Sequence, residues 1–138
     1  MEQPRALGLL SIARKGGNVQ LGEESVSAAC RDGHARLVIA ASDAADNTLR
    51  RVENAAGGQI PVIRVPFTRE ELGNAAGRAM CAAAALTDVR LAQAFVLALN
   101  EPEKYAQTLA GLDRRVQRAE QRRKEERAHE YNVKHGKK

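Results

Sequence analysis

Three continuous apolar runs limit the folds open to this chain more than any other feature of its sequence. They are ARLVIAAS (35–42), IPVIRV (60–65) and CAAAALT (81–87). A run without polar alternation is typical of a strand that is covered on both faces. A fourth, shorter strand is predicted at NVQL (18–21). The chain therefore predicts a sheet enclosed between layers of helices, which places it in the α/β class.

Helix boundary signals fall between these runs. Thr68 and Glu71 have the spacing of a capping box, and Asp43 and Asp88 are candidate N-caps. With the prolines and glycines that flank them, these signals predict helices over residues 4–15, 23–32, 44–56, 69–76 and 89–99. Helices and strands then alternate along the chain. Such alternation predicts a three-layer α/β/α sandwich around a mixed four-stranded sheet.

Residues 101–138 break the alternation. They begin with a helical stripe of heptad type, formed by Tyr105, Leu109, Leu112, Val116 and Ala119. The charged stretch EQRRKEER follows, so we expect a helix that packs its first turns on the body and then enters solvent. The predicted organisation is an α/β/α domain over 1–100, an amphipathic and then charged helix over 101–128, and a basic disordered tail over 129–138.

The net charge of +5 lies entirely in this C-terminal segment. Residues 1–112 carry 12 basic and 12 acidic side chains, whereas residues 113–138 carry 10 basic and five acidic ones. The chain is thus a neutral domain with a basic appendage. If the protein binds RNA, we expect this appendage to add phosphate contacts.

The sequence lacks the patterns of several functional classes. GGNVQLGEES has no lysine after its last glycine, which argues against an NTP-binding loop, and GNAAG lies in a helix, where close packing explains its glycines. The histidines join no Cys-x-x-Cys pair, so we expect no metal. No Ser/His/Asp set appears, so we expect neither an enzyme nor a cofactor.

Cysteine usage and hydropathy bear on the compartment. Cys30 and Cys81 lie in alanine-rich surroundings and form no spaced pair, so we expect buried thiols in a reducing cytoplasm. No apolar run approaches the roughly 18–20 residues of a membrane span. The sequence predicts a soluble, cytoplasmic protein without a membrane partner.

The stretch GEES (22–25) places acids where a helix usually attracts anions. With two phenylalanines, two tyrosines and no tryptophan, the chain cannot stack bases on an aromatic platform. A carboxylate can instead accept hydrogen bonds from unpaired guanine N–H groups, and a glycine beside it lets RNA come close. Helix capping explains Glu23 and Glu24 equally well, so both interpretations remain open.

Longer stretches resemble a known family. In order they are LLSIARKGGNVQLGEESV, ACRDGHARLVIAASDAADNT, IPVIRV, REELGNAAG and AAAALTD. Over about residues 5–100 the chain resembles the kink-turn RNA-binding ribosomal-protein superfamily (L-seven-Ae, L-thirty-e and relatives), and most of all its bacterial YlxQ-type members. The resemblance implies an α/β/α sandwich that clamps a kinked RNA internal loop with tandem sheared G·A pairs, without catalysis.

The resemblance also implies an RNA-binding turn before the second helix. In the family this turn carries Gly, a variable residue, Asn or Asp and often Glu, with a Lys one turn later. The matching residues here are Gly22, Glu23, Glu24, Ser25 and Ala28. The lysine is therefore replaced by alanine.

Two further contacts follow from the resemblance. The loop after GNAAG supplies Arg78, Ala79 and Met80, of which Arg78 suits a phosphate and Met80 the face of a flipped base. Arg14 and Lys15 match a basic stretch near the RNA in the family.

We therefore expect a non-catalytic RNA-binding protein whose partner is structured RNA, such as a kink-turn in rRNA or mRNA, within the ribosome or another ribonucleoprotein. The alternative is a protein-interaction module on the same fold that has lost specific RNA readout. The neutral body, Ala28 in place of lysine and the stripe over 105–119, which could dock a protein partner, favour that alternative.

Overall fold

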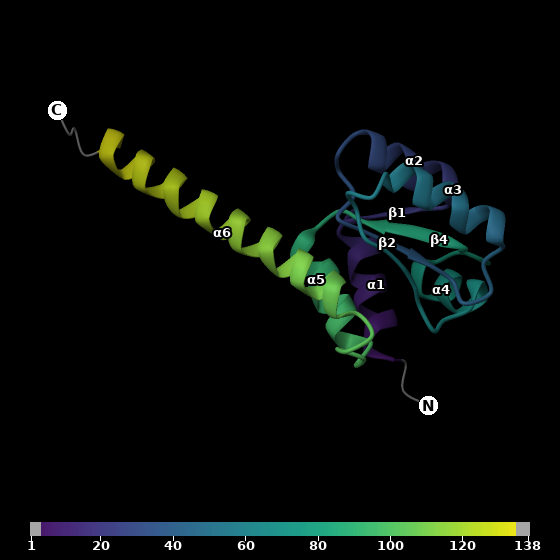
Figure 1. Ribbon diagram of the computed structural model, residues 1–138. Helices are drawn as coiled ribbons and strands as arrows, with labels where there is room; N and C mark the ends of the chain where they lie inside the picture. The colour runs from purple at the N-terminus through teal and green to yellow at the C-terminus, as the bar shows by residue number, and fades with distance from the viewer. Residues whose placement is uncertain (1–3, 135–138) are drawn as a thin grey trace.

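The alternation of strands and helices is present in the computed structural model, which describes residues 4–134 (Figure 1). The elements follow in the order α1 (Arg5–Lys15), β1 (Val19–Leu21), α2 (Glu23–Arg31), β2 (Leu37–Ala40), α3 (Asp46–Ala56), β3 (Val62–Arg64), α4 (Arg69–Ala76), β4 (Ala83–Leu86), α5 (Val89–Ala98) and α6 (Ala106–Lys134). Within residues 4–134, no helix combines the length and the apolar character needed to cross a membrane.

The four strands form one mixed sheet in the order β1-β4-β2-β3, which confirms the predicted sheet. β2 and β3 run parallel, whereas β4 is antiparallel to both of its neighbours. Ala84 of β4 thus pairs with Leu21 on one side and with Ile39 on the other. Every residue of β2 and β4 is buried, as their continuous apolar runs predict.

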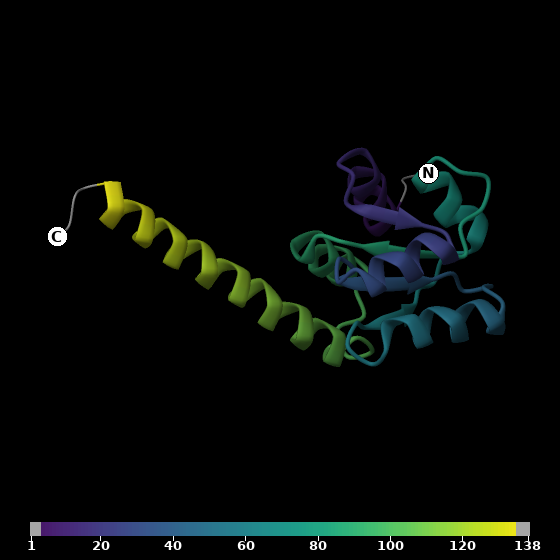
Figure 2. The same ribbon diagram turned by 90° about the horizontal axis from the view of Figure 1, so that it is seen from above.

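Two layers of helices cover the sheet, which confirms the sandwich (Figure 2). Successive strand residues point to opposite faces, so Val38 and Ile39 of β2 belong to different halves of the core. α2 and α3 pack against the Val38 face, whereas α1, α4 and α5 cover the Ile39 face. Leu10 of α1 and Phe95 of α5 are almost fully buried there.

Strand β3 differs from its prediction. IPVIRV was expected to be buried on both faces, but β3 forms the edge of the sheet and pairs only with β2. Ile63 is buried, whereas Arg64 is exposed. An edge strand pairs with a neighbour on one side only. The apolar character of IPVIRV predicts a strand but does not say whether that strand lies at the edge or in the middle of the sheet.

Two of the three predicted helix caps are confirmed. The Thr68 hydroxyl accepts a hydrogen bond from the Glu71 N–H at 3.1 Å, and the Glu71 carboxylate accepts one from the Thr68 N–H at 3.0 Å. The Asp88 carboxylate accepts hydrogen bonds from the Arg90 N–H at 2.9 Å and from the Leu91 N–H at 3.0 Å. These bonds satisfy N–H groups that the first turn of a helix leaves free.

The predicted cap at Asp43 was wrong. Helix α3 begins at Asp46, three residues after Asp43. Its N-cap residue is Ala45, whose side chain makes no capping hydrogen bond. Asp43 instead accepts a hydrogen bond at 2.8 Å from the N–H of Arg69, the first residue of α4. The carboxylate therefore caps a helix that is distant in sequence.

Helix α6 packs on the body and then projects from it, as predicted (Figures 1 and 2). Leu112 and Val116 are buried, and Tyr105, just before the helix, donates a hydrogen bond to the Arg64 carbonyl oxygen at 3.2 Å. Residues 120–133 are exposed. The helix continues to Lys134 although disorder was expected from residue 129, and the rest of the predicted tail, 135–138, lies outside the described residues.

Replacing Leu112 with alanine tests whether α6 is part of the folded body. Leu112 is 1% exposed, so Leu112→Ala should lower the free energy of unfolding by about 2–4 kcal/mol. Leu97→Ala is the matched control, since Leu97 is 57% exposed and should cost less than about 0.5 kcal/mol. Thermal and denaturant unfolding measure both variants, and equal effects would mean that α6 does not dock.

Candidate nucleic-acid interface

Gly22 forms the turn between β1 and α2. Its φ of 92° and ψ of 155° lie in a region that is open essentially to glycine alone. The Gly22 N–H donates a hydrogen bond to the Ala83 carbonyl oxygen at 2.9 Å, which ties the turn to the first residue of β4. Glu23 and Glu24 follow in the first turn of α2, where the free N–H groups carry partial positive charge.

The loop after α4 folds back onto that helix. The Arg78 N–H donates to the Gly73 carbonyl oxygen at 2.7 Å, and the Cys81 N–H donates to the Arg69 carbonyl oxygen at 2.9 Å. A Cβ on Gly73 would lie only 2.8 Å from the backbone of Met80, so the loop lies directly on the helix. Gly73 of GNAAG therefore serves close packing, as predicted.

Arg78 joins this loop to the Gly22 turn. Its Nη1 atom lies 3.5 Å from the Leu21 carbonyl oxygen and would lie 3.5 Å from a Cβ on Gly22. Ala79 and Met80 beside it are exposed, Met80 by 57%. The structure thus places the Arg78 guanidinium beside the start of α2, and the exposed Met80 thioether follows two residues later in the same loop. A guanidinium suits a phosphate, and a thioether suits the face of a base.

The two glutamates of α2 have different surroundings. Glu23 forms an ion pair of 3.0 Å with Arg51 of α3 and so links the two helices of its layer. Glu24 is exposed, and its carboxylate makes no hydrogen bond or ion pair with any described residue. Glu24 is therefore the acceptor that a ligand can reach. The sequence analysis did not single out Arg51. In the sequence it is one basic residue on the exposed side of a predicted helix, and nothing there connects it to Glu23.

Ser25 and Ala28 lie on a neighbouring side of α2. Both are half-buried, and with Gln20 of the edge strand β1 they line a shallow cavity of about 380 Å³. Glu24 and Ala28 are one helical turn apart. A longer side chain at position 28 would therefore extend along the same part of the helix as Glu24.

Arg14 and Lys15 lie elsewhere. Both are exposed at the end of α1, which leads into the start of β1, whereas Gly22 follows its end. The Asn18 carbonyl oxygen accepts a hydrogen bond from the Thr87 N–H at 3.0 Å, which marks the last turn of α1 as a neighbour of the far end of β4. A three-residue strand of about 10 Å thus separates this basic pair from the Gly22 turn.

The two cysteines are buried and free, as predicted. Burial raises the pKa of both thiols, and at Cys81 the nearby Arg78 and two backbone hydrogen bonds oppose that rise. The Cys81 thiol donates a hydrogen bond to the Ala83 carbonyl oxygen at 3.2 Å. Burial therefore favours the protonated form of both thiols.

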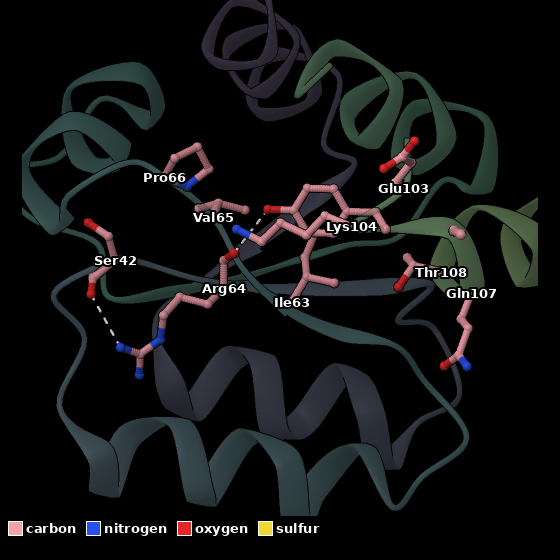
Figure 3. Close-up of a pocket in the computed structure, with 11 residues that line it drawn as sticks. Ser42, Ile63, Arg64, Val65, Pro66, Glu103, Lys104, Gln107 and Thr108 are labelled. Atoms are coloured by element: carbon pink, nitrogen blue, oxygen red, sulfur yellow. Dashed lines mark hydrogen bonds between the residues drawn. The ribbon is translucent and has the colours of Figure 1, made fainter. Parts of the chain in front are cut away.

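A larger cavity of about 890 Å³ lies between β3 and the start of α6 (Figure 3). Arg64 lines it and donates a hydrogen bond to the Ser42 carbonyl oxygen at 3.3 Å. Glu103 is the one carboxylate among the residues described as lining it, and neither histidine nor cysteine is among them.

Comparison with known proteins gives two kinds of match. The sequence model of the family described as ribosomal protein L7Ae/L30e/S12e/Gadd45 matches residues 5–96, so all of α6 lies beyond the match. Among solved structures, a protein of unknown function from Bacillus halodurans is 30% identical, with a TM-score of 0.66. The similarity covers 72% of this chain and all of that one.

A second similar structure is a 15.5 kD RNA-binding protein of Giardia lamblia, which is 19% identical with a TM-score of 0.56. The similarity covers 71% of this chain and 84% of that one, and it shows the shared fold. No curated protein sequence matched the chain.

Two glycine-to-alanine variants test how firmly the loop is seated on α4. Gly73→Ala should lower the free energy of unfolding by about 1–3 kcal/mol, because its Cβ would meet the Met80 backbone. Gly8→Ala, in α1, has open space around the new Cβ and should raise it by about 0.5–1 kcal/mol. Denaturant unfolding compares the two. If both variants are stabilised, the loop does not pack on Gly73.

Proposed function

We propose that this chain, which belongs to the ribosomal protein L7Ae/L30e/S12e/Gadd45 family, binds structured RNA through the Gly22 turn and the loop over 78–80. Membership of this family supports an RNA-binding role. The observation that carries the proposal is the approach of Arg78 to Gly22 and Leu21, which joins two distant segments of the chain into one exposed surface.

Each exposed group on this surface has a role in the proposal. Arg78 contacts a phosphate, for which its guanidinium offers paired donors. Met80 packs on the face of a base that has left its stack. Glu24 accepts hydrogen bonds from base N–H groups, whereas Glu23 stays paired with Arg51. The acidic start of α2 repels phosphates, so the RNA must present base donors to it.

A kinked internal loop with G·A pairs is the RNA that these groups favour. Guanines outside Watson–Crick pairs expose N1–H and N2–H₂ donors, which a carboxylate can accept. The resemblance of the sequence to kink-turn binding proteins supports the same ligand. Because Ala28 stands where that family carries lysine, we propose that this protein binds a kink-turn more weakly than its relatives do.

The setting that we propose is ribosomal or other ribonucleoprotein RNA in the cytoplasm. The family description supports the association with ribosomes. Two buried, free thiols suit a reducing compartment. No reaction is part of the proposal, because the family supports RNA binding rather than catalysis.

The alternative, a protein-interaction module, is still favoured by the neutral body and by the alanine at position 28. It loses most of the stripe over 105–119, because Tyr105, Leu112 and Val116 are buried against the body and offer no apolar face to another chain. The RNA-binding proposal is therefore the stronger of the two.

Two substitutions on α2 test the RNA surface. Ala28→Lys should tighten binding to a kink-turn RNA by about 1–3 kcal/mol, because the new ammonium can make a charge-assisted contact from the same side as Glu24. Ala28→Gln, of comparable length without the charge, is the matched control. Glu24→Ala should weaken binding and reduce discrimination against a plain duplex of equal length.

Gel shifts and FRET measurements of RNA kinking record both effects. The proposal fails if the wild-type protein does not distinguish the kink-turn from the duplex and Ala28→Lys changes neither affinity. In that event the glutamates act only at the start of the helix, and the protein-interaction alternative takes precedence.

A further inference from the structure

A groove rich in arginine runs between α6 and the body, beside the turn that joins β4 to α5. Its volume is about 610 Å³. One wall carries Arg36, just before β2, and the other is the α6 surface. We call it the arginine groove and define it by Arg36, Arg115, Arg118, Arg122 and Arg123.

The cations of the arginine groove lack carboxylate partners. Its described lining includes two acids, Asp88 and Glu126, and Asp88 already caps α5. Arg36 donates to the Gly33 carbonyl oxygen at 2.8 Å, and Arg115 donates to the Gln59 carbonyl oxygen at 2.9 Å. Within residues 4–134, none of the five arginines takes part in an ion pair.

Repulsion among these cations opposes the stability of the fold. Arg118 and Arg122 are four residues apart on α6, and like charges at that spacing destabilise a helix. The pKa of Arg115 is lowered by its burial and by the nearby charges of Arg36 and Arg118. By contrast, Arg90 of α5 does pair with Glu120 of α6 at 2.8 Å. Unpaired cations gathered on two facing elements are better explained by an anionic ligand.

We propose that the arginine groove is a second RNA-binding surface, which holds the phosphate backbone of double-stranded RNA. Guanidinium groups bind phosphate oxygens bidentately and read no sequence. Arg115 to Arg123 extend over about 12 Å of helix, which suits a backbone rather than one small anion. The described lining holds no aromatic side chain, so stacking of single-stranded bases is not provided for.

The arginine groove and the Gly22 surface lie at opposite ends of β4. Gly22 bonds to Ala83 at its start, whereas the Arg36 N–H donates to the Leu86 carbonyl oxygen at its end, at 2.8 Å. Asn18, three residues after Lys15, accepts a hydrogen bond from the Thr87 N–H, so the chain that leaves α1 reaches this second end of β4. Both surfaces bind RNA in these proposals, but the arginine groove needs no contribution from the Gly22 surface. One protein could hold two helical segments of an RNA.

The test uses the full chain and a plain RNA duplex without an internal loop. Arg118→Gln with Arg122→Gln removes two groove charges, whereas the matched pair Lys124→Gln with Arg127→Gln removes two from the same helix outside the groove lining. The groove pair should lower duplex affinity at least tenfold and flatten its salt dependence by about 0.9 per lost phosphate contact in log–log slope. Arg36→Gln, on the body, should act in the same direction.

The inference is overturned if both pairs lose affinity equally, which would indicate diffuse attraction to the helix, or if Arg36→Gln changes nothing. Two readouts separate the two surfaces: Glu24→Ala should reduce the discrimination between the kink-turn and the plain duplex, whereas the groove pair should lower the affinity for the plain duplex itself. Binding to the plain duplex therefore decides the groove proposal, independently of the kink-turn measurements.

Discussion

The insertion of β4 between β1 and β2 is the constraint on which both candidate surfaces depend. Its antiparallel pairing with both neighbours brings the loop after α4 to the Gly22 turn at one end. At the other end the same pairing brings the start of α5 to Arg36. Neither surface contains a strand residue of β4, yet the position of each follows from where this strand begins and ends.

Much of the fold could be predicted because its signals are local. Thr68 and Glu71 form their capping box within one turn, and continuous apolar runs indicate the buried strands. The failures have tertiary causes. Asp43 is a good capping residue, but its partner is Arg69, which no local rule connects to it. The edge position of β3 depends on the order of strands in the sheet, which the alternation of elements leaves open.

The candidate surfaces divide in the same way. Gly22 and Arg78 were predicted from the resemblance, and their closeness is consistent with it. That Glu23 is held by Arg51, and that Arg14 and Lys15 lie a strand length from Gly22, depends on helix packing and strand direction. The arginine groove could not be predicted, because α6 places its cations only through the way it docks. The sequence shows how many arginines this helix carries, but not that several of them lie across a groove from Arg36.

The strand β4 is built mainly from alanine, and every one of its side chains is buried. Small side chains let the helices of both layers come near the backbone of the sheet. A larger residue there would force the layers apart. The alanines of this strand therefore leave room for the bulkier side chains that the helices of both layers bury against the sheet.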